Sequence, residues 1–408
     1  MKSVIATTAT AVSALMCLNS FAYADDTKTE FEQAIADTKP IFQFRARFET
    51  VDLEAFEEDA EALTTRIRAG FETGAYKGFK FLVDFEHVEA HTSDFNSTIN
   101  GQTGFPVVAD PEVNELNRFQ LTYTGLEDTV VTAGRQRIKH DDDRFIGNVG
   151  WRQNEQTFDA FRIVNTSVEN LKIDFAYIGQ VNRIFGDDSP IGRWDSESFI
   201  LDVDYKLPVE FANLTLSGFS YILDFGQDAP GASSATYGAM LQGKKGPFFG
   251  KARFATQSDY AENPTDYTAE YYNVEAGLGA NGLSGLVGYE VLGSDDGAAA
   301  FSTPLATLHK FNGFADLFLG TPATGLEDLY FTAKYTTQNL GPAKAFTAFA
   351  TYHTFTSDFG DIDYGDEFNA VATAKFGRTS VLLKYADYEA DEFNGDAAKF
   401  WLQLDWSF

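Results

Sequence analysis

The sequence predicts an all-β fold, a transmembrane antiparallel β-barrel of about 18 strands, within a range of roughly 16 to 20. Three observations predict this fold. Apolar and polar residues alternate along most of the chain, the alternating segments are about ten residues long, and no segment after residue 24 approaches the ~18 apolar residues of a spanning helix. A tilted strand of that length crosses a bilayer with one face toward lipid and the other toward a wet interior.

Residues 1–24 have the features of a secretory signal peptide. Lys2 provides a positive start, small and apolar residues follow, and Ala22-Tyr23-Ala24 matches an A-x-A cleavage site. The alternative, a lipoprotein acylated at Cys17, is disfavoured by the lack of leucine three positions ahead. Because Cys17 is the only cysteine, the mature chain is expected to contain neither disulfides nor thiolate metal sites. Residues 25–39 lack alternation, which indicates a short periplasmic tail or helix before a barrel at 40–408.

The first alternating segment, 41–50, shows the pattern most clearly. Its apolar and polar faces are Phe42, Phe44, Ala46 and Phe48 against Gln43, Arg45, Arg47 and Glu49. Similar alternation recurs at 63–72, 79–86 and 198–205. Half-buried strands of a soluble sandwich would alternate in the same way. However, these segments are long enough to cross a bilayer and too numerous for one sandwich.

Nineteen segments alternate, but single-chain bacterial barrels have even strand numbers, short periplasmic turns and long outer loops. The links 74–78, 125–128, 169–170, 244–247 and 280–283 are short, and those between them are long. Short turns and long loops alternate along the whole chain only if 311–319 is not a spanning strand. We therefore place 311–319 in one long outer loop at about 293–327. Eighteen strands and nine outer loops remain.

The last segment is the strongest local signal for a barrel that closes on itself. Phe400, Leu402, Leu404, Trp406 and Phe408 alternate with polar residues up to the end of the sequence. An open strand edge in lipid would leave backbone groups unpaired, so we expect this strand to pair with the first one. A terminal phenylalanine also resembles the signal that the barrel-assembly machinery recognises.

Composition excludes several function classes. The chain has 60 acidic and 31 basic residues, and removing residues 1–24 takes away only Lys2, so a nucleic-acid partner is not expected. The acidic outer loops, including 141–143, predict a solvated surface with loose divalent ions near lipopolysaccharide rather than a defined metal site. The five histidines form no H-E-x-x-H, and G-x-S-x-G is absent. We therefore expect no enzyme and no cofactor, although Asp84 and Glu86 could pair by chance as glycosidase carboxylates.

Arginine is concentrated before residue 165, where it falls on polar strand faces. Stacked inside a barrel, these side chains would form a basic wall that attracts anions. The predicted wall consists of Arg45, Arg47, Arg66, Arg68, Arg118, Arg135, Arg137 and Arg152. Carboxylates from later strands would face it, namely Asp174, Asp202, Asp204 and Glu290. The alternative is that the arginines pair with nearby acids such as Glu49, Glu72 or Glu86 and only fill the lumen, and the sequence leaves both open.

Four blocks resemble the alginate-export-like outer-membrane porins. They are RARFETVDLE followed by ALTTRIRAGFETGAYKGF (45–54 and 62–79), GRQRIKHDDDRFIGNVGWRQNEQTFDAFRI (134–163), HKFNGFADLFLGTPATGLEDLY (309–330), and the stretch 363–408. The resemblance implies an eighteen-stranded barrel with an arginine-lined constriction that passes a polyanionic sugar chain. Matching positions are Arg45, Arg47, Arg66, Arg68, Arg135, Arg137 and Arg152, the last of which is expected on a strand or on an infolded loop.

We therefore expect a porin-type channel in the outer membrane of a Gram-negative bacterium, for small polar solutes with a bias toward anions or acidic sugars. Lipid, lipopolysaccharide and the assembly machinery are the expected partners, and a homotrimer is one expected assembly. Two alternatives remain open. One is dedicated export of an acidic polysaccharide, which a mature chain with 30 basic and 60 acidic residues disfavours. The other is a non-conducting adhesin or anchor, plugged by the loops at 139–156 and 293–327.

Overall fold

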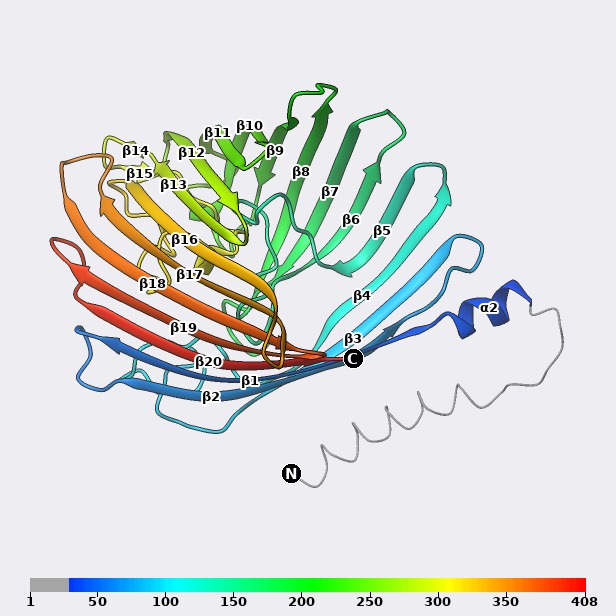
Figure 1. The fold of residues 1–408 in the computed structure, drawn as a ribbon, viewed down its shortest axis with the longest axis horizontal. Coiled ribbons are helices and arrows are strands. Elements are labelled where there is room, and N and C mark those ends of the chain that lie inside the picture. The colour runs from blue at the N-terminus through cyan, green and yellow to red at the C-terminus, as the bar shows by residue number, and fades with distance from the viewer. Residues whose placement is uncertain (1–28) are drawn as a thin grey trace.

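The computed structural model describes residues 29–408, in which eighteen antiparallel strands form one closed barrel (Figure 1). The predicted signal peptide lies outside the described residues. The strands are β1 (Lys39–Leu53), β2 (Ala60–Glu72), β3 (Phe79–Ala90), β4 (Val113–Leu126), β5 (Thr129–Gln136), β6 (Thr157–Asn165), β7 (Leu171–Asn182), β8 (Arg193–Leu207), β9 (Asn213–Leu223), β10 (Ser234–Lys245), β11 (Phe248–Asp259), β12 (Thr268–Ala280), β13 (Leu283–Leu292), β16 (Leu326–Leu340), β17 (Ala343–Thr356), β18 (Asp363–Phe376), β19 (Thr379–Ala390) and β20 (Ala397–Ser407). The predicted fold class and strand number are confirmed.

The barrel closes between its first and last strands, as predicted. Residues 43–53 of β1 pair antiparallel with β20, from Gln43 opposite Ser407 to Leu53 opposite Ala397. The backbone amide of Phe408 then donates to the carbonyl of Phe42 at 2.9 Å. No edge of the sheet is left open, which is the condition for a sheet in lipid.

Two rims differ in how they connect the strands. One rim, here called the turn rim, has eight connections of two to six residues and lies beside the start of β1 and the end of β20. At one of them Asn281 and Gly282 have φ values of 51° and 83°, as the tightest hairpin turns require. The other rim, the loop rim, has nine connections of six to 33 residues. Residues 311–319 lie in the longest of these, at 293–325, so their removal from the predicted strands is confirmed.

The helix α2 (Glu30–Ala36) precedes the barrel on the turn-rim side (Figure 1). Thr29 and Glu32 form a capping box at its start. Its Ala34 carbonyl accepts a 3.0 Å hydrogen bond from the amide of Gly74, in the turn between β2 and β3. A short helix was one of the two forms expected for residues 25–39. None of the helices in the described part of the chain is long and apolar enough to span a membrane.

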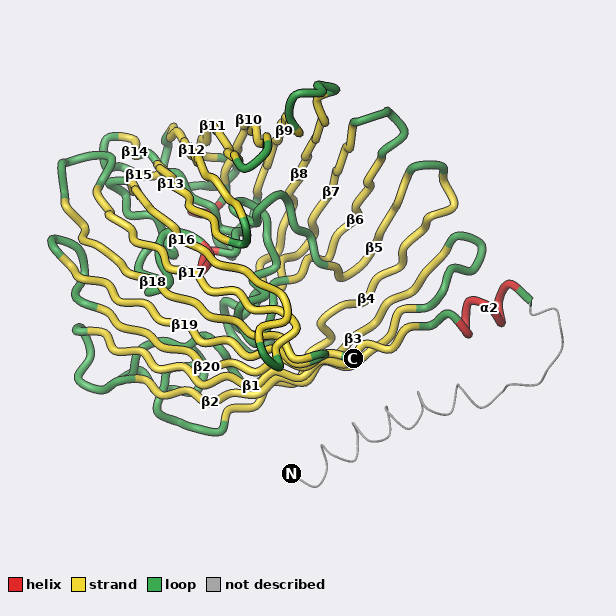
Figure 2. The backbone as a smooth tube through the Cα atoms, viewed as in Figure 1, coloured by secondary structure: helices red, strands yellow, loops and turns green. Residues whose placement is uncertain are grey.

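The two faces of the sheet follow the predicted alternation. Outward side chains are mostly apolar and exposed, for example Phe119, Phe161 and Leu404 at 50%, 44% and 39%. The inward face carries most of the buried charges, and near the loop rim it also contributes aromatic residues to a hydrophobic core inside the barrel. The core lies inside because two long loops fold into the lumen and pack there (Figure 2).

Candidate pore and its constriction

Two loops of the loop rim turn inward and narrow the lumen. We call residues 137–156 inner loop 1 and residues 293–325, which include the small hairpin β14 (Ser294–Asp295) and β15 (Ala299–Ala300), inner loop 2. Inner loop 1 reaches the wall at β1, where Arg45 Nη1 donates to the carbonyl of Trp151 at 3.0 Å. Inner loop 2 reaches β18, where the amide of Ala315 donates to Glu367 Oε1 at 2.9 Å.

The inner loops also bind each other. The amide of Gly147 donates to the Leu305 carbonyl at 2.9 Å, and that of Thr307 donates to the Asp143 carbonyl at 3.0 Å. Phe145 of inner loop 1 packs against Phe301 of inner loop 2, with ring centroids 5.9 Å apart, and against Tyr271 of β12, with ring centroids 5.2 Å apart. Buried aromatic and backbone contacts together hold both loops as one packed body inside the barrel.

A second buried cluster ties this body to the wall at β19 and β20. Trp151 of inner loop 1 stacks on His309 of inner loop 2 with ring centroids 4.5 Å apart. His309 contacts Lys384 of β19 at 2.6 Å on one nitrogen and Asp316 at 2.6 Å on the other. Asp316 also pairs with Lys399 of β20 at 3.2 Å. Burial opposes the charged form of His309, and its pKa lies well below its usual value.

Most of the predicted arginines lie at the lumen wall where inner loop 1 docks, and each has an acidic partner there. Arg47 pairs with Asp110 at 3.4 Å, and Arg152 with Glu49 at 3.0 Å. The other pairs are Arg45 with Asp405, Arg66 and Arg68 with Glu86, Arg118 with Asp84, and Arg68 and Arg137 with Glu155. This pattern is the pairing with nearby acids that the sequence left open, rather than a bare basic wall.

Glu155 of inner loop 1 links strands β2 and β4 to Arg137, at the start of the same loop, through its carboxylate. It accepts from Arg137 Nε at 2.7 and 2.8 Å and from Asn117 at 2.8 Å, and it lies 3.2 Å from Arg68. Burial alone would raise the pKa of Glu155, but Arg68 and Arg137 outweigh burial and hold it at about 2. The carboxylate is therefore ionised over the physiological range and anchors the loop.

Two predicted positions differ from the expected strand placement. Arg135 was expected in the lumen, but its register partners are Phe119 and Asp159, and Phe119 is exposed on the outward face. Bulges in the neighbouring strand pairs shift which residues face inward. Arg137 lies just after the end of β5, and its side chain turns to Glu155 in inner loop 1. Arg152 lies on an infolded loop, one of the two placements expected.

The four predicted opposing carboxylates contact cations other than the arginine wall. Asp174 accepts from Arg162 Nε at 2.7 Å, and Lys172 Nζ lies 3.9 Å from Asp202 and 3.2 Å from Asp204. Glu290 pairs with Arg144 of inner loop 1 at 2.8 Å. Each of these carboxylates therefore has a cationic partner close by.

Unpaired positive charge occurs elsewhere, near the turn rim. Five lysines share the inward parity of their strands: Lys80, Lys206, Lys244, Lys334 and Lys375. Four are exposed and Lys80 is half-buried. Within residues 29–408, none of the five forms an ion pair at 4.0 Å or less. The alternation at 79–86 puts Lys80 on a polar face, but lysines spread one to a strand form no cluster in the sequence as the arginines do.

One of these lysines lines a polar cavity beside inner loop 1. The cavity has a volume of 460 Å³ and is bordered by Lys244, Lys251, Glu275 and Asp142. Asp142 contacts Lys251 at 2.8 Å and Arg253 at 3.0 Å. Burial would raise the pKa of Asp142, but these two cations hold it well below its usual range. This charged cavity thus extends from Lys244, near the turn rim, to Asp142 of inner loop 1.

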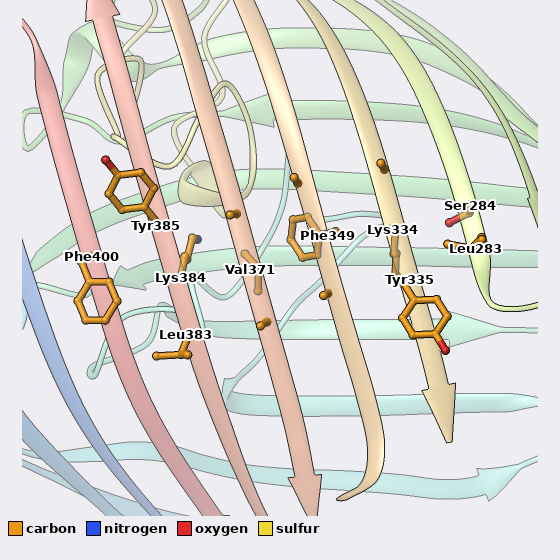
Figure 3. A pocket seen from close by; sticks show the side chains of 15 residues that line it. Leu283, Ser284, Lys334, Tyr335, Phe349, Val371, Leu383, Lys384, Tyr385 and Phe400 are labelled. Carbon is orange, nitrogen blue, oxygen red and sulfur yellow. The ribbon is translucent and has the colours of Figure 1, made fainter. Parts of the chain in front are cut away.

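A different hollow lies over the sheet at β16 to β20 (Figure 3). It has a volume of 510 Å³, and its lining includes Ala333, Ala350 and Ala370, which are register partners on the outward face. Tyr385 and Phe400 border it. Small side chains among large ones produce this apolar hollow, which belongs largely to the outward surface rather than to the pore.

The carboxylates that could have formed a glycosidase pair are not accessible. Asp84 and Glu86 are 0% and 2% exposed and are engaged by Arg118 and Arg68. A glycoside could not reach either group without breaking these pairs. The arrangement therefore supports a structural role for both residues.

Searches with family models and curated proteins found no match, so the resemblance to alginate-export-like porins remains a prediction. Solved structures do match. Pseudomonas aeruginosa OpdO aligns with a TM-score of 0.67 at 15% identity, over 91% of this chain and 97% of that one. P. aeruginosa OccK9 (OpdG) aligns with a TM-score of 0.69 at 13% identity, over 92% and 99%. P. aeruginosa OpdK, solved with vanillate, aligns with a TM-score of 0.67 at 12% identity, over 91% and 99%. At these identities the likeness shows the fold, a closed 18-stranded antiparallel β-barrel.

Proposed function

We propose that the protein is an outer-membrane, porin-type diffusion channel of a Gram-negative bacterium, for small polar solutes with a preference for anions. The observation that carries the anion preference is the set of five inward lysines without acidic partners among the described residues. The solved structures that share the fold are outer-membrane porins, which supports the membrane placement. The signal peptide, passage through the assembly machinery and contact with lipopolysaccharide belong to the same proposal, with the turn rim facing the periplasm.

The position of the inner loops favours small solutes over a polymer. They contact the wall at β1, β13, β18, β19 and β20, so a solute has only the space that they leave. A polysaccharide chain would need both loops to leave a packed core. Vanillate, with which P. aeruginosa OpdK was solved, is a small aromatic carboxylate, and a solute of that kind suits a lysine-lined approach. Diffusion down a gradient needs no cofactor.

Ion selectivity in planar bilayers tests the proposal. The barrel refolded from residue 25 is placed under a KCl gradient, and the reversal potential is compared with that of a Lys206→Gln/Lys334→Gln/Lys375→Gln variant. We expect the wild type to prefer chloride and the variant to lose most of this preference, because exposed charges set the field in the lumen. A Lys245→Gln/Lys344→Gln variant, at the turn rim but of outward parity, is the matched control and is expected to keep the preference. Cation preference in the wild type would overturn the anion bias.

The packed inner loops favour one second candidate, a plugged barrel. Replacing 141–152 with a short Gly-Ser linker removes the part of inner loop 1 that crosses to β1. If the proposal holds, the wild type conducts and the shortened variant conducts severalfold more. A wild type that does not conduct, beside a shortened variant that does, would favour the plugged barrel. Shortening the loop at 54–59 is the control, because this loop lies on the same rim and is not one of the two inner loops.

A further inference from the structure

Three carboxylates meet where inner loop 1 leaves the wall. Asp141 comes from the loop, and Asp202 and Asp204 come from the inward face of β8. One oxygen of each lies within 4.8 Å of the others. Asp202 is 1% exposed, and one of its oxygens, Oδ2, has no hydrogen-bond partner in the part of the chain that the structure describes. Like charges at this distance repel unless a cation lies between them.

An independent feature points to the same place. His140 is 3% exposed, and neither of its ring nitrogens has a hydrogen-bond partner within residues 29–408. Its Nε2 lies 3.7 Å from Asp174 Oδ2, too far for a hydrogen bond, and Asp174 is the register partner of Asp202. A buried imidazole without partners costs free energy, and a metal ion would satisfy one of its nitrogens.

Two cations already lie near the cluster. Asp174 is engaged by Arg162, and Asp141 lies 3.7 Å from Arg253. The nearest cation to the cluster is Lys172, whose Nζ is 3.2 Å from Asp204 and 3.9 Å from Asp202. Its side chain is 39% exposed, so it can swing into the lumen. Lys172 is therefore the competitor that an incoming ion would displace.

We propose that Asp141, Asp202 and Asp204 hold a divalent transition-metal ion, and that the unpartnered imidazole of His140, which lies beside Asp174 at the edge of the carboxylate cluster, turns to the bound ion as a fourth ligand. Mixed carboxylate and imidazole ligands suit Mn²⁺ and Zn²⁺ better than Ca²⁺, which prefers oxygen alone. Since two ligands lie on inner loop 1 and two on β8, the ion would fix the loop to the wall. This inference does not depend on the barrel being a channel.

The site is tested by measuring Mn²⁺ binding to the folded barrel in detergent. Binding is followed as the loss of the electron paramagnetic resonance signal of free Mn²⁺. We expect the wild-type barrel to bind one more Mn²⁺ ion than the Asp202→Asn barrel. In the His140→Gln barrel we expect the site to remain but its affinity for Mn²⁺ to be at least about tenfold lower than in wild type. Lys172→Gln is expected to bind more tightly because it removes the competing ammonium group. Asp358→Asn, on another loop of the loop rim, is the control and should match wild type.

Foldedness is checked for every variant by heat-dependent mobility on gels. If Asp202→Asn does not fold, Asp141→Asn gives the same test from a loop position. Equal Mn²⁺ binding by wild type and these variants would overturn the site. Displacement of Mn²⁺ by Ca²⁺ at equal concentration would overturn the role of His140, since oxygen ligands alone would then explain the binding.

Discussion

The two halves of the lumen use positive charge in opposite ways. Toward the loop rim, arginines such as Arg47 and Arg66 are 1% and 4% exposed and lie against acidic partners. Toward the turn rim, lysines such as Lys206 and Lys375 are exposed, and in the described chain they lie outside every ion pair. Arginine makes several hydrogen bonds in a fixed plane, which suits a buried joint, while lysine remains a hydrated point charge.

The comparison teaches that the amount of charge on a wall does not determine its role. In a buried ion pair the two opposite charges lie side by side and away from water, so the field of each charge is largely cancelled by that of its partner. An exposed, unpaired ammonium keeps its field in the solvent, where a passing anion responds to it. We therefore propose that the arginine half of the lumen docks the inner loops and that the lysine half attracts solutes, and three predictions test this proposal.

Removing one partner of a buried pair should have the largest effect. Asp110 is 0% exposed, pairs with Arg47 at 3.4 Å and accepts from the amide of Gln153 at 2.8 Å. Asp110→Asn leaves Arg47 buried without its carboxylate, so we expect a loss of about 3–5 kcal/mol in unfolding free energy. Urea denaturation of the refolded barrel in detergent measures it. A loss below about 1 kcal/mol, the value for surface pairs, would mean that the arginine half is solvated.

The sequence predicted the barrel well because alternation depends only on strand geometry and a two-sided environment. It could also exclude 311–319 as a strand, since parity of turns and loops is a property of the whole chain. Part of the arginine pairing was open to prediction, since Glu49 and Glu86 were candidate partners in the sequence, but the pairs with Asp110 and Glu155 were not, because these two carboxylates lie on long loops. Asp110 meets Arg47 only because inner loop 1 and the loop at 91–112 fold into the same space.

Local irregularities explain the remaining errors. Arg135 faces outward because bulges on neighbouring strands break the simple count of two, as between Asp159 and Ala160. A bulge inserts one residue and leaves no firm mark in a single sequence. The five inward lysines could not be recognised as unpaired from the sequence, because their lack of acidic partners among residues 29–408 becomes apparent only when all strands are placed around one lumen.

The second prediction concerns the pH dependence of loop docking. The pKa of Glu155 is about 2 in the fold against 4.5 ordinarily, so the folded state favours the ionised carboxylate. This contribution, up to about 3 kcal/mol, is fully present above pH 4.5 and is lost as pH falls through 2. We expect wild type to exceed Glu155→Gln in stability at neutral pH, with the difference shrinking as the pH falls below 4.5. Denaturation curves of both proteins measure it, and other carboxylates cancel in the difference. If the difference in unfolding free energy between wild type and Glu155→Gln stayed constant down to pH 2, the ionised carboxylate of Glu155 would not be what anchors inner loop 1.

The smallest effect on stability is expected in the lysine half. Lys206 is exposed near the end of β8, so Lys206→Gln should change the unfolding free energy by less than about 0.5 kcal/mol. Its effect should appear in the reversal potential instead. Arg66→Gln is the matched substitution in the other half, where a buried guanidinium donates to the Gln153 carbonyl at 3.1 Å, and it should lower stability while leaving selectivity nearly unchanged. If Lys206→Gln destabilised the barrel as much as Arg66→Gln, lysine would be structural there, and the two halves would not differ in kind.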